Sequence, residues 1–156
     1  MDYQVELNEI APQPVAEMRF VTSMQKIGED IGIAFQKIFA YLCETGENPV
    51  GPPFTLYFYE GEFDPDNIDM EVCIPVSRVL EGKGEVIGRE VPGGIMASTM
   101  HFGPYIGLEP AYKAIDAWVK DNGYRYSGPA REVYLNDPNQ VDEKDLQTKI
   151  LMQVSK

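Results

Sequence analysis

Apolar residues recur every three or four positions in two stretches of the chain, which is the spacing of helices that bury one side. The second stretch has Pro110 in its first turn and Gly123 as its terminator, both in positions that suit a helix. The apolar positions that define the two helices are Met24, Ile27, Ile31, Phe35, Ile38 and Leu42 in the first, and Leu108, Ala111, Tyr112, Ile115 and Val119 in the second.

The start of the first helix carries mixed signals. Thr22 and Gln25 form a capping-box pattern, and Gly46 is a stop signal at the other end. Gly28 and Gly32 lower the helix propensity of the first turns. This predicts either a late start of the helix or a close approach of its backbone to a sheet.

Four other stretches alternate apolar and polar residues, as strands with two unlike faces do. They are GPPFTLYF at 51–58, MEVCIPV at 70–76, GPAREVYL at 128–135 and TKILMQV at 148–154. A further strand is expected from Tyr3 to Ile10. The acidic segments 61–67 and 136–145 carry turn residues and are expected to be solvated hairpin connections.

The chain is an internal repeat. Tyr57 of the first Gly-Pro strand matches Tyr134 of the second, and at the same offset the two helices and their glycine stops also coincide. Repeat one spans about 1–78 and repeat two about 86–156, within a single domain of residues 1–156. Each half therefore predicts a βαββ unit, and the whole an α+β fold with a curved antiparallel sheet that carries both helices on one face.

Strand alternation divides the side chains between two faces of this sheet. We expect one face to meet the helices, and the opposite face to present tyrosines around one carboxylate. The expected helix-facing residues are Phe54, Leu56, Phe58, Met70, Val72, Ile74 and Val76. The expected opposite face holds Thr55, Tyr57, Tyr59, Glu132 and Tyr134. This second face is either ordinary solvent-exposed surface or the wall of a site for a cationic or aromatic guest, which a carboxylate among rings would attract.

Composition narrows the choice of partners. The chain has 156 residues, 25 acidic against 13 basic, and a net charge of −12, so clustered basic residues for nucleic-acid binding are absent from its pattern. The acidic balance modestly favours cationic ligands. The amino-terminal sequence lacks a secretory signal, and no stretch is long enough to span a membrane, so a cytoplasmic location is expected.

Metal and cofactor motifs are not evident. Cys43 and Cys73 lie among apolar residues and are both expected in the core. Zinc spacings, phosphate loops and Ser-His-Asp orders are missing. The acidic residues around Asp64 to Glu71 lack the calcium-loop spacing and indicate a solvated turn. We expect neither a metal nor a cofactor.

The second half resembles the gyrase-inhibitor-like family, also called the AraC-type effector-binding domain. The family pattern has a glycine before a small-residue strand, a His-x-Gly-x-Tyr turn, a helix with Ala-Tyr, a glycine, and Glu-x-Tyr followed by Asn-Asp-Pro. The matching residues are Gly94, His101, Gly103, Tyr105, Ala111, Tyr112, Trp118, Gly123, Glu132, Tyr134, Asn136, Asp137 and Pro138. The first half matches more loosely, and its duplicated unit extends the resemblance over the chain.

The resemblance implies a pseudo-twofold domain with a ligand cleft at the junction of its halves. In drug-sensing members the Glu of Glu-x-Tyr contacts lipophilic cations, which assigns Glu132 to the cleft floor. Tyr134, Tyr57, Tyr59 and Tyr105 are the candidate rings around it. Trp118 is expected either to pack against the sheet or to close one end of the cleft. Family regulators usually carry a helix-turn-helix domain ahead of this module, and no such segment precedes the expected first strand.

Three functions remain open. The first is a stand-alone domain that senses or sequesters lipophilic, cationic or aromatic compounds. The second is a hydrolase of strained cyclopropane-containing toxins, as some relatives are, in which Glu132 would activate water or transfer a proton. Glu71 is the one further acid considered, and alternation alone does not assign its face. The third is an inhibitor of gyrase. Haem-binding relatives share the fold, but His101 lies in the His-x-Gly turn, where a structural hydrogen bond is expected.

Overall fold

The computed structural model describes residues 3–59 and 62–156 and divides the chain into two compact units. Unit 1 combines the N-terminal residues through Ala11 with Gly93–Lys156, and unit 2 is Pro12–Pro92. Together the described residues form two α-helices and eight strands, and neighbouring strands within each unit run antiparallel. This confirms the predicted α+β class.

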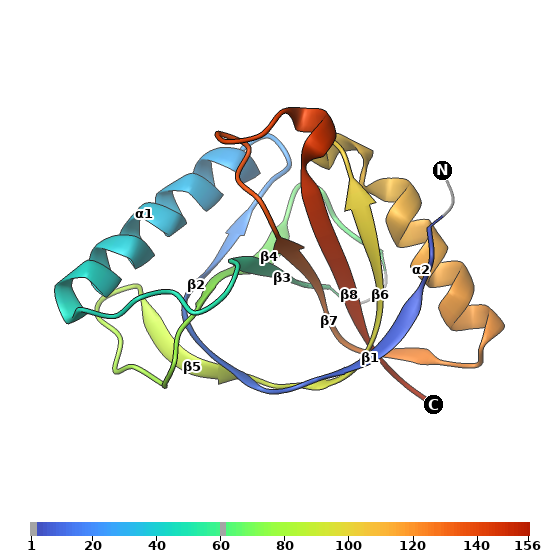
Figure 1. Cartoon of the computed structure of the whole chain (residues 1–156), viewed down its shortest axis with the longest axis horizontal. Coiled ribbons are helices and arrows are strands. Elements are labelled where there is room, and N and C mark those ends of the chain that lie inside the picture. The colour runs from blue at the N-terminus through green and yellow to red at the C-terminus, as the bar shows by residue number, and fades with distance from the viewer. Residues whose placement is uncertain (1–2, 60–61) are drawn as a thin grey trace. The chain divides into compact units, whose positions relative to one another are not determined.

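In the part of unit 2 that the structure describes, one helix packs on a sheet of four strands, which Figure 1 labels. Its elements are β2 (Gln13–Thr22), α1 (Ile27–Thr45), β3 (Phe54–Phe58), β4 (Ile68–Pro75) and β5 (Ile87–Val91). The strand order is β3-β4-β2-β5, and α1 packs on β2 and β4. The strand β5, which alternation did not indicate, forms the edge beside β2.

Unit 1 has the same plan. Its elements are β1 (Glu6–Ile10), β6 (Gly94–Phe102), the short 3-10 helix η1 (Tyr105–Gly107), α2 (Glu109–Asp121), β7 (Arg125–Tyr134), the 3-10 helix η2 (Glu143–Asp145) and β8 (Gln147–Ser155). The strand order is β1-β6-β8-β7, and α2 packs on β6, β7 and β8. The expected first strand is shorter than predicted, because pairing with β6 begins at Glu6.

The repeated order strand, helix, strand, strand is present in both units as β2-α1-β3-β4 and β6-α2-β7-β8. Each unit also has one edge strand, which is not the sequence neighbour of the strand it pairs with. The strand β1 directly precedes β2 in sequence but pairs with β6, and β5 directly precedes β6 but pairs with β2. The two sequence repeats therefore have the same order of elements, and each gains an equivalent edge strand.

The first helix begins late, as one of the two alternatives predicted. Its N-cap is Lys26 and its last residue is Thr45, followed by the C-cap Gly46, whose positive φ of 75° is the left-handed conformation of a helix stop. The capping box is wrong: Thr22 ends β2, and its hydroxyl bonds to the Asp30 carboxylate. A Cβ placed on Gly28 would meet nothing within 4 Å, so this glycine does not mark a close approach of the helix to the sheet.

The expected faces of β3 are reversed. In an antiparallel pair, residues directly opposite share a face, and Thr55 and Tyr57 lie opposite Val72 and Met70. The helix covers this face, because Thr22 opposite Ile68 bonds to Asp30 of α1. The prediction that the helix-facing residues of β3 are Phe54, Leu56 and Phe58 is therefore wrong. Alternation misled here because Phe54, Thr55, Leu56 and Tyr57 are all buried, at 3%, 0%, 1% and 8% exposure, so burial does not distinguish the faces.

The two cysteines differ. Cys73 on β4 is fully buried, as predicted, whereas Cys43 on α1 is exposed and its assignment to the core is wrong. Cys43 lies one position past the buried Leu42, where the helix turns its side chains outward.

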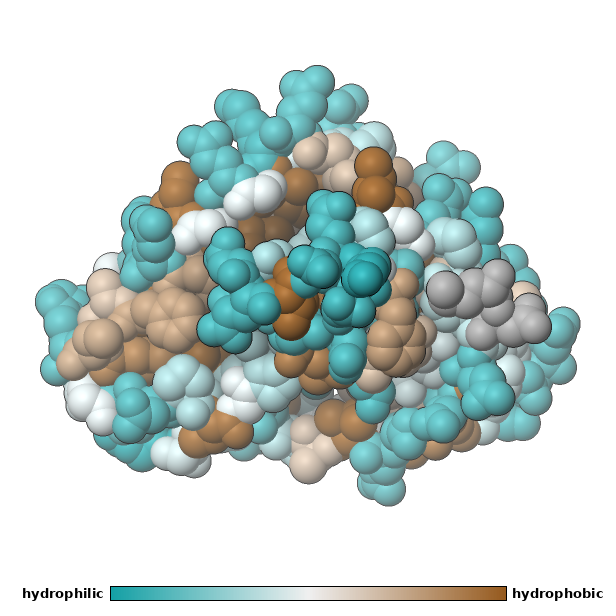
Figure 2. Space-filling model, turned by 45° about the horizontal axis from the view of Figure 1, so that its top comes forward, coloured by the Kyte–Doolittle hydropathy of each residue, from teal (hydrophilic) through white to brown (hydrophobic). Residues whose placement is uncertain are grey.

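Much of the surface is polar. Hydrophilic residues cover a large part of the face drawn in Figure 2, interrupted by hydrophobic patches. No helix in the described part of the chain has the length and apolar character needed to cross a membrane.

Candidate functional site

A buried carboxylate lies between the sheet and the helix of unit 1. Glu132 on β7 is 8% exposed, and the Tyr112 hydroxyl of α2 donates a hydrogen bond to its Oε2. The Tyr134 hydroxyl donates to Oε1 at 3.0 Å. Glu132 therefore faces α2, and the prediction that it lies on the sheet face opposite the helices is wrong.

Local geometry explains why these three groups meet. Glu132 and Tyr134 are two residues apart on a strand and so share a face. Tyr112 lies in the first turn of α2, just after the buried Leu108 and Ala111 that hold this end of the helix on the sheet. A helical side chain leans toward the N-terminus of its helix, which directs the Tyr112 ring along this turn.

Burial raises the pKa of the Glu132 carboxyl group above its ordinary value. The hydrogen bonds from Tyr112 and Tyr134, and the nearby His101, favour the ionised form and partly offset this rise. Among the residues that the structure describes, neither an arginine nor a lysine forms an ion pair with Glu132. The Glu132 carboxyl group therefore takes up a proton more readily than an exposed glutamate, and a nearby cation would stabilise its charged form.

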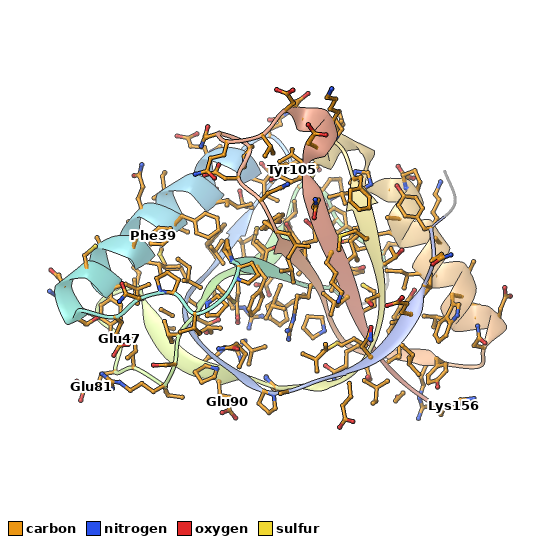
Figure 3. All side chains as sticks on the ribbon, in the orientation of Figure 1. Phe39, Glu47, Glu81, Glu90, Tyr105 and Lys156 are labelled. Atoms are coloured by element: carbon orange, nitrogen blue, oxygen red, sulfur yellow. The ribbon has the colours of Figure 1, made fainter. Side chains whose placement is uncertain are left out.

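Tyr105 forms the outer part of this group. Its ring packs edge-on against Tyr134 with 5.6 Å between ring centroids, and the residue is 39% exposed. In Figure 3, Tyr105 lies at the end of the sheet where β6 ends and β8 begins. Burial raises the pKa of its phenol, and the charges of Asp137 and Glu132 raise it further. Two of the predicted rings, Tyr105 and Tyr134, are therefore gathered at Glu132.

His101 supports the turn that carries Tyr105. It is 4% exposed on β6, and its Nε2 lies 3.0 Å from the Pro104 carbonyl oxygen. Since a carbonyl only accepts, Nε2 carries the proton. Nδ1 lies 2.8 Å from the Tyr3 hydroxyl. The hydrogen bond expected for His101 in this turn is present.

The remaining predicted rings lie elsewhere. Trp118 stacks on Tyr124 with 5.5 Å between centroids, six residues beyond Tyr112 on α2. In unit 2, Tyr57 is buried on the α1 side of β3. Tyr59 is 44% exposed and packs edge-on against Phe63 beside a small surface hollow.

Sequence reasoning missed the role of Tyr112. The spacing of Tyr112 from Leu108 and Ile115 predicts that it belongs to the apolar stripe of the second helix. The available signal was its polar tip: a tyrosine in the first turn of a helix that packs on a sheet places a hydroxyl near the strand below. The tyrosine hydroxyl identifies a partner only once Glu132 is known to face the helix.

A second buried acidic group lies in unit 2, on the sheet face away from α1. Donor atoms of Glu17, Glu71 and Cys73 all lie within 4.8 Å of one another, and this is the one such group among the described residues. Arg89 of β5 already bonds to Glu17 at 2.7 Å and to Glu71 at 2.6 Å.

This group does not favour a metal ion. Burial and the neighbouring Glu71 raise the pKa of Glu17 to about 8 against the opposing effect of Arg89, which favours a proton on this acidic pair. Glu71 is paired with Arg89 at 2.6 Å and lies 3.7 Å from Arg19, so cations of the protein already occupy the place of a metal ion. The acidic segment near Asp64 also has its own partners, since Asp64 accepts from the Asp66 backbone and Asp69 pairs with Arg19 at 2.8 Å.

Comparison of this chain with known proteins identifies a matching family. The sequence model of the GyrI-like small molecule binding domain matches residues 3–155. The C-terminal domain of EcmrR is similar at 29% identity and a TM-score of 0.86, covering 100% of this chain and 99% of that one. EcmrR in a complex with DNA is similar at 28% identity and a TM-score of 0.87, covering 99% of this chain. This chain spans 58% of that longer EcmrR chain.

More distant structures share the fold alone. A hydrolase encoded by lin2189 from Listeria innocua is 16% identical with a TM-score of 0.72, covering 97% of this chain and 92% of that one. SAV2435 bound to tetraphenylphosphonium is 15% identical with a TM-score of 0.66, covering 99% of this chain and 94% of that one. A search of curated protein sequences found no significant match.

Proposed function

Because the chain belongs to the family of GyrI-like small molecule binding domains, we propose that it binds lipophilic organic cations and that Glu132 is their counter-ion. The observation that carries this proposal is the buried carboxylate of Glu132, which is held by two tyrosine hydroxyls. A buried carboxylate without a cationic partner is costly when ionised. A ligand cation would remove that cost, and the two hydroxyls would hold the carboxylate in place for it.

The rings around Glu132 suit the apolar part of such a ligand. Tyr105, Tyr112 and Tyr134 offer aromatic surface beside the carboxylate. A cation over a ring face gains about 0.5 to 2 kcal/mol, depending on how far it is desolvated. The predicted contributions of Tyr57, Tyr59 and Trp118 stay predictions.

The relatives are consistent with this chemistry. SAV2435 is known with tetraphenylphosphonium, a lipophilic cation, and the EcmrR domain belongs to a protein that binds DNA. By analogy, we propose that this domain senses or sequesters such compounds, with a role in transcription regulation through a partner. The expected cytoplasmic location stays a prediction.

Titration with tetraphenylphosphonium tests the counter-ion proposal. Wild type, Glu132→Gln and Glu109→Gln are compared by calorimetry at pH 8. Glu109 is a matched control because it is on α2 in the same unit and its side chain is 75% exposed. We expect Glu132→Gln to weaken binding by about tenfold or more, since a charge-assisted contact contributes about 1.5 to 3 kcal/mol. Equal affinity of wild type and Glu132→Gln would contradict the proposal.

A second candidate is hydrolysis of strained cyclopropane-containing compounds. The raised pKa of Glu132 favours it, because a carboxyl group that titrates closer to neutral pH can transfer a proton or activate water. A relative described as a hydrolase has the same fold. Incubation with a cyclopropane-bearing alkylator, followed by mass spectrometry, tests it. Turnover that Glu132→Gln abolishes and Glu109→Gln retains would support catalysis, and binding without product would exclude it for that compound.

A further inference from the structure

The turn that carries Tyr105 is held to the rest of unit 1 at two points. The Pro104 carbonyl accepts from His101 Nε2 at 3.0 Å, and the Gly103 amide donates to the Leu146 carbonyl at 2.9 Å. Gly103 has a φ of 123°, a conformation that a side chain would strain. Pro104 is followed directly by Tyr105, whose ring packs on Tyr134. The position of Tyr105 therefore depends on His101.

The other ring nitrogen of His101, Nδ1, contacts the N-terminal segment. The Tyr3 hydroxyl lies 2.8 Å from His101 Nδ1, and the two rings stack with 6.1 Å between centroids. The next residue is also tied to β6, because the Thr99 hydroxyl donates to the Gln4 carbonyl at 2.7 Å. From Glu6 onward the segment pairs with β6 as β1. The start of the described chain is thus fixed to the strand that carries His101.

The two hydrogen bonds of His101 depend on each other. Nε2 carries a proton because it faces the Pro104 carbonyl, and in the tautomer with its one proton there, Nδ1 is the acceptor for the Tyr3 hydroxyl. Hydrogen bonds in such a chain polarise one another, so weakening one weakens the next. His101 lies opposite Thr148, which in turn lies opposite Tyr134, so the imidazole is on the same face of the sheet as the Glu132 site.

We propose that His101 is a positioning residue that couples the Glu132 site to the N-terminal segment. This inference rests on the proposed function, because it concerns the ligand that Glu132 binds. A ligand that reaches the buried carboxylate meets Tyr105 and shifts its ring from Tyr134. Because Tyr105 and Pro104 are adjacent, the shift moves the carbonyl that His101 binds. The change at Nε2 then alters the bond from Nδ1 to Tyr3 and the stability of β1.

The experiment uses the chain's single histidine as its reporter. The ring nitrogens of His101 are followed by long-range ¹H–¹⁵N correlation spectra, and amide hydrogen exchange is measured for residues 4–10. Wild type is compared with Tyr3→Phe, which removes only the tyrosine hydroxyl that contacts His101 Nδ1. The matched control is Tyr126→Phe, in the same unit, whose hydroxyl bonds to Asp116 at 2.8 Å and not to His101. The probe is tetraphenylphosphonium.

With the probe bound, we expect both ring nitrogens to shift and the exchange rates of β1 to change by at least about fivefold, the lower range of measured couplings. The control Tyr126→Phe should respond in the same way, and Tyr3→Phe should lose the response in β1. Bound probe with unchanged His101 nitrogens or unchanged β1 exchange in wild type would overturn the coupling while leaving the binding proposal intact. An equal response in Tyr3→Phe would also overturn it.

A second arm needs no ligand. Glu132→Gln removes the charge that holds the Tyr134 hydroxyl, and we expect it to shift the His101 nitrogens and to change β1 exchange. The change in β1 should persist when Glu132→Gln is combined with Tyr126→Phe and disappear when it is combined with Tyr3→Phe. Absence of the change in Glu132→Gln would overturn the coupling. If the probe fails to bind, the proposed cation function fails, and this second arm still decides the coupling.

Discussion

At the scale of single residues, the proposed binding of cations at Glu132 should depend on pH. Burial raises the pKa of its carboxyl group, and a cation gains its full attraction only from the ionised form. Binding of a cation at this site therefore competes with binding of a proton. Both Tyr112 and Tyr134 favour the ionised form by donating to it, so they help the cation.

We predict that the affinity for tetraphenylphosphonium rises with pH below the pKa of Glu132 and becomes constant above it. The probe does not titrate, so the change reports the protein, and its limiting slope is about tenfold in affinity per pH unit. Dissociation constants measured from pH 5 to pH 9 check this. Glu132→Gln should give a flat profile, and a wild-type profile as flat as that of the variant would contradict the prediction.

The Tyr112 hydroxyl should determine the pH at which the affinity for tetraphenylphosphonium rises. Its hydrogen bond lowers the pKa of Glu132, so Tyr112→Phe should raise that pKa further and move the rise in affinity to higher pH. The same variant should lose about 1 to 3 kcal/mol of unfolding free energy at high pH, where an ionised buried group lacks a donor. Tyr126→Phe is the control, and coincident pH profiles of Tyr112→Phe and wild type would contradict this role.

At the scale of elements, a buried ionic group fastens β5 to the sheet of unit 2. Arg89 of β5 bonds to Glu17 of β2 and Glu71 of β4, and both glutamates are 3% exposed. Removing Arg89 would leave a buried carboxylate without this cationic partner, which costs about 3 to 5 kcal/mol. Arg19 also lies 3.7 Å from Glu71, so two guanidinium groups contact this acidic pair.

The unfolding free energy should consequently fall as pH rises from about 4.5 to about 8, the ordinary and folded pKa of Glu17. In this range the folded protein retains a proton that the unfolded chain releases, so the contribution of Glu17 to stability falls by up to about 1.4 kcal/mol per pH unit. Urea unfolding from pH 4.5 to pH 9 measures it. Glu17→Gln should remove this part of the slope.

The exposed Glu90 on β5, labelled in Figure 3, supplies the control for that experiment. Glu90→Gln should keep the wild-type slope, because Glu90 lies outside the buried group. Equal slopes in wild type and Glu17→Gln would show that Glu17 is ionised in the folded protein at neutral pH.

At the scale of the whole molecule, charge should speed the arrival of cations. The net charge of −12 creates a field that attracts cationic ligands and that salt screens. We predict that the association rate of tetraphenylphosphonium falls as salt is raised from 10 to 300 mM, by about tenfold. The neutral compound triphenylphosphine oxide is the matched probe, measured by stopped flow under the same conditions. Equal salt dependence of the two rates would exclude steering by charge.

The sequence by itself determined the elements and their repetition. Helical spacing around Ile38 and Ile115, and alternation in the Gly-Pro strands, are local properties that the chain's own periodicity records. The same is true of the stops at Gly46 and Gly123, which both adopt positive φ. The pairing of Glu132 with Tyr134 also follows from sequence, because residues two apart on a strand share a face.

Only the tertiary structure decided that Glu132 and Tyr134 lie on the sheet face that α2 covers. Alternation separates two faces but does not say which one a helix covers, and where both are buried, as in β3, burial carries no information. Strand register and helix packing brought Tyr112 to Glu132, and register likewise joined Glu17, Glu71 and Arg89. These groups are far apart in sequence, and their contacts depend on how the elements pack.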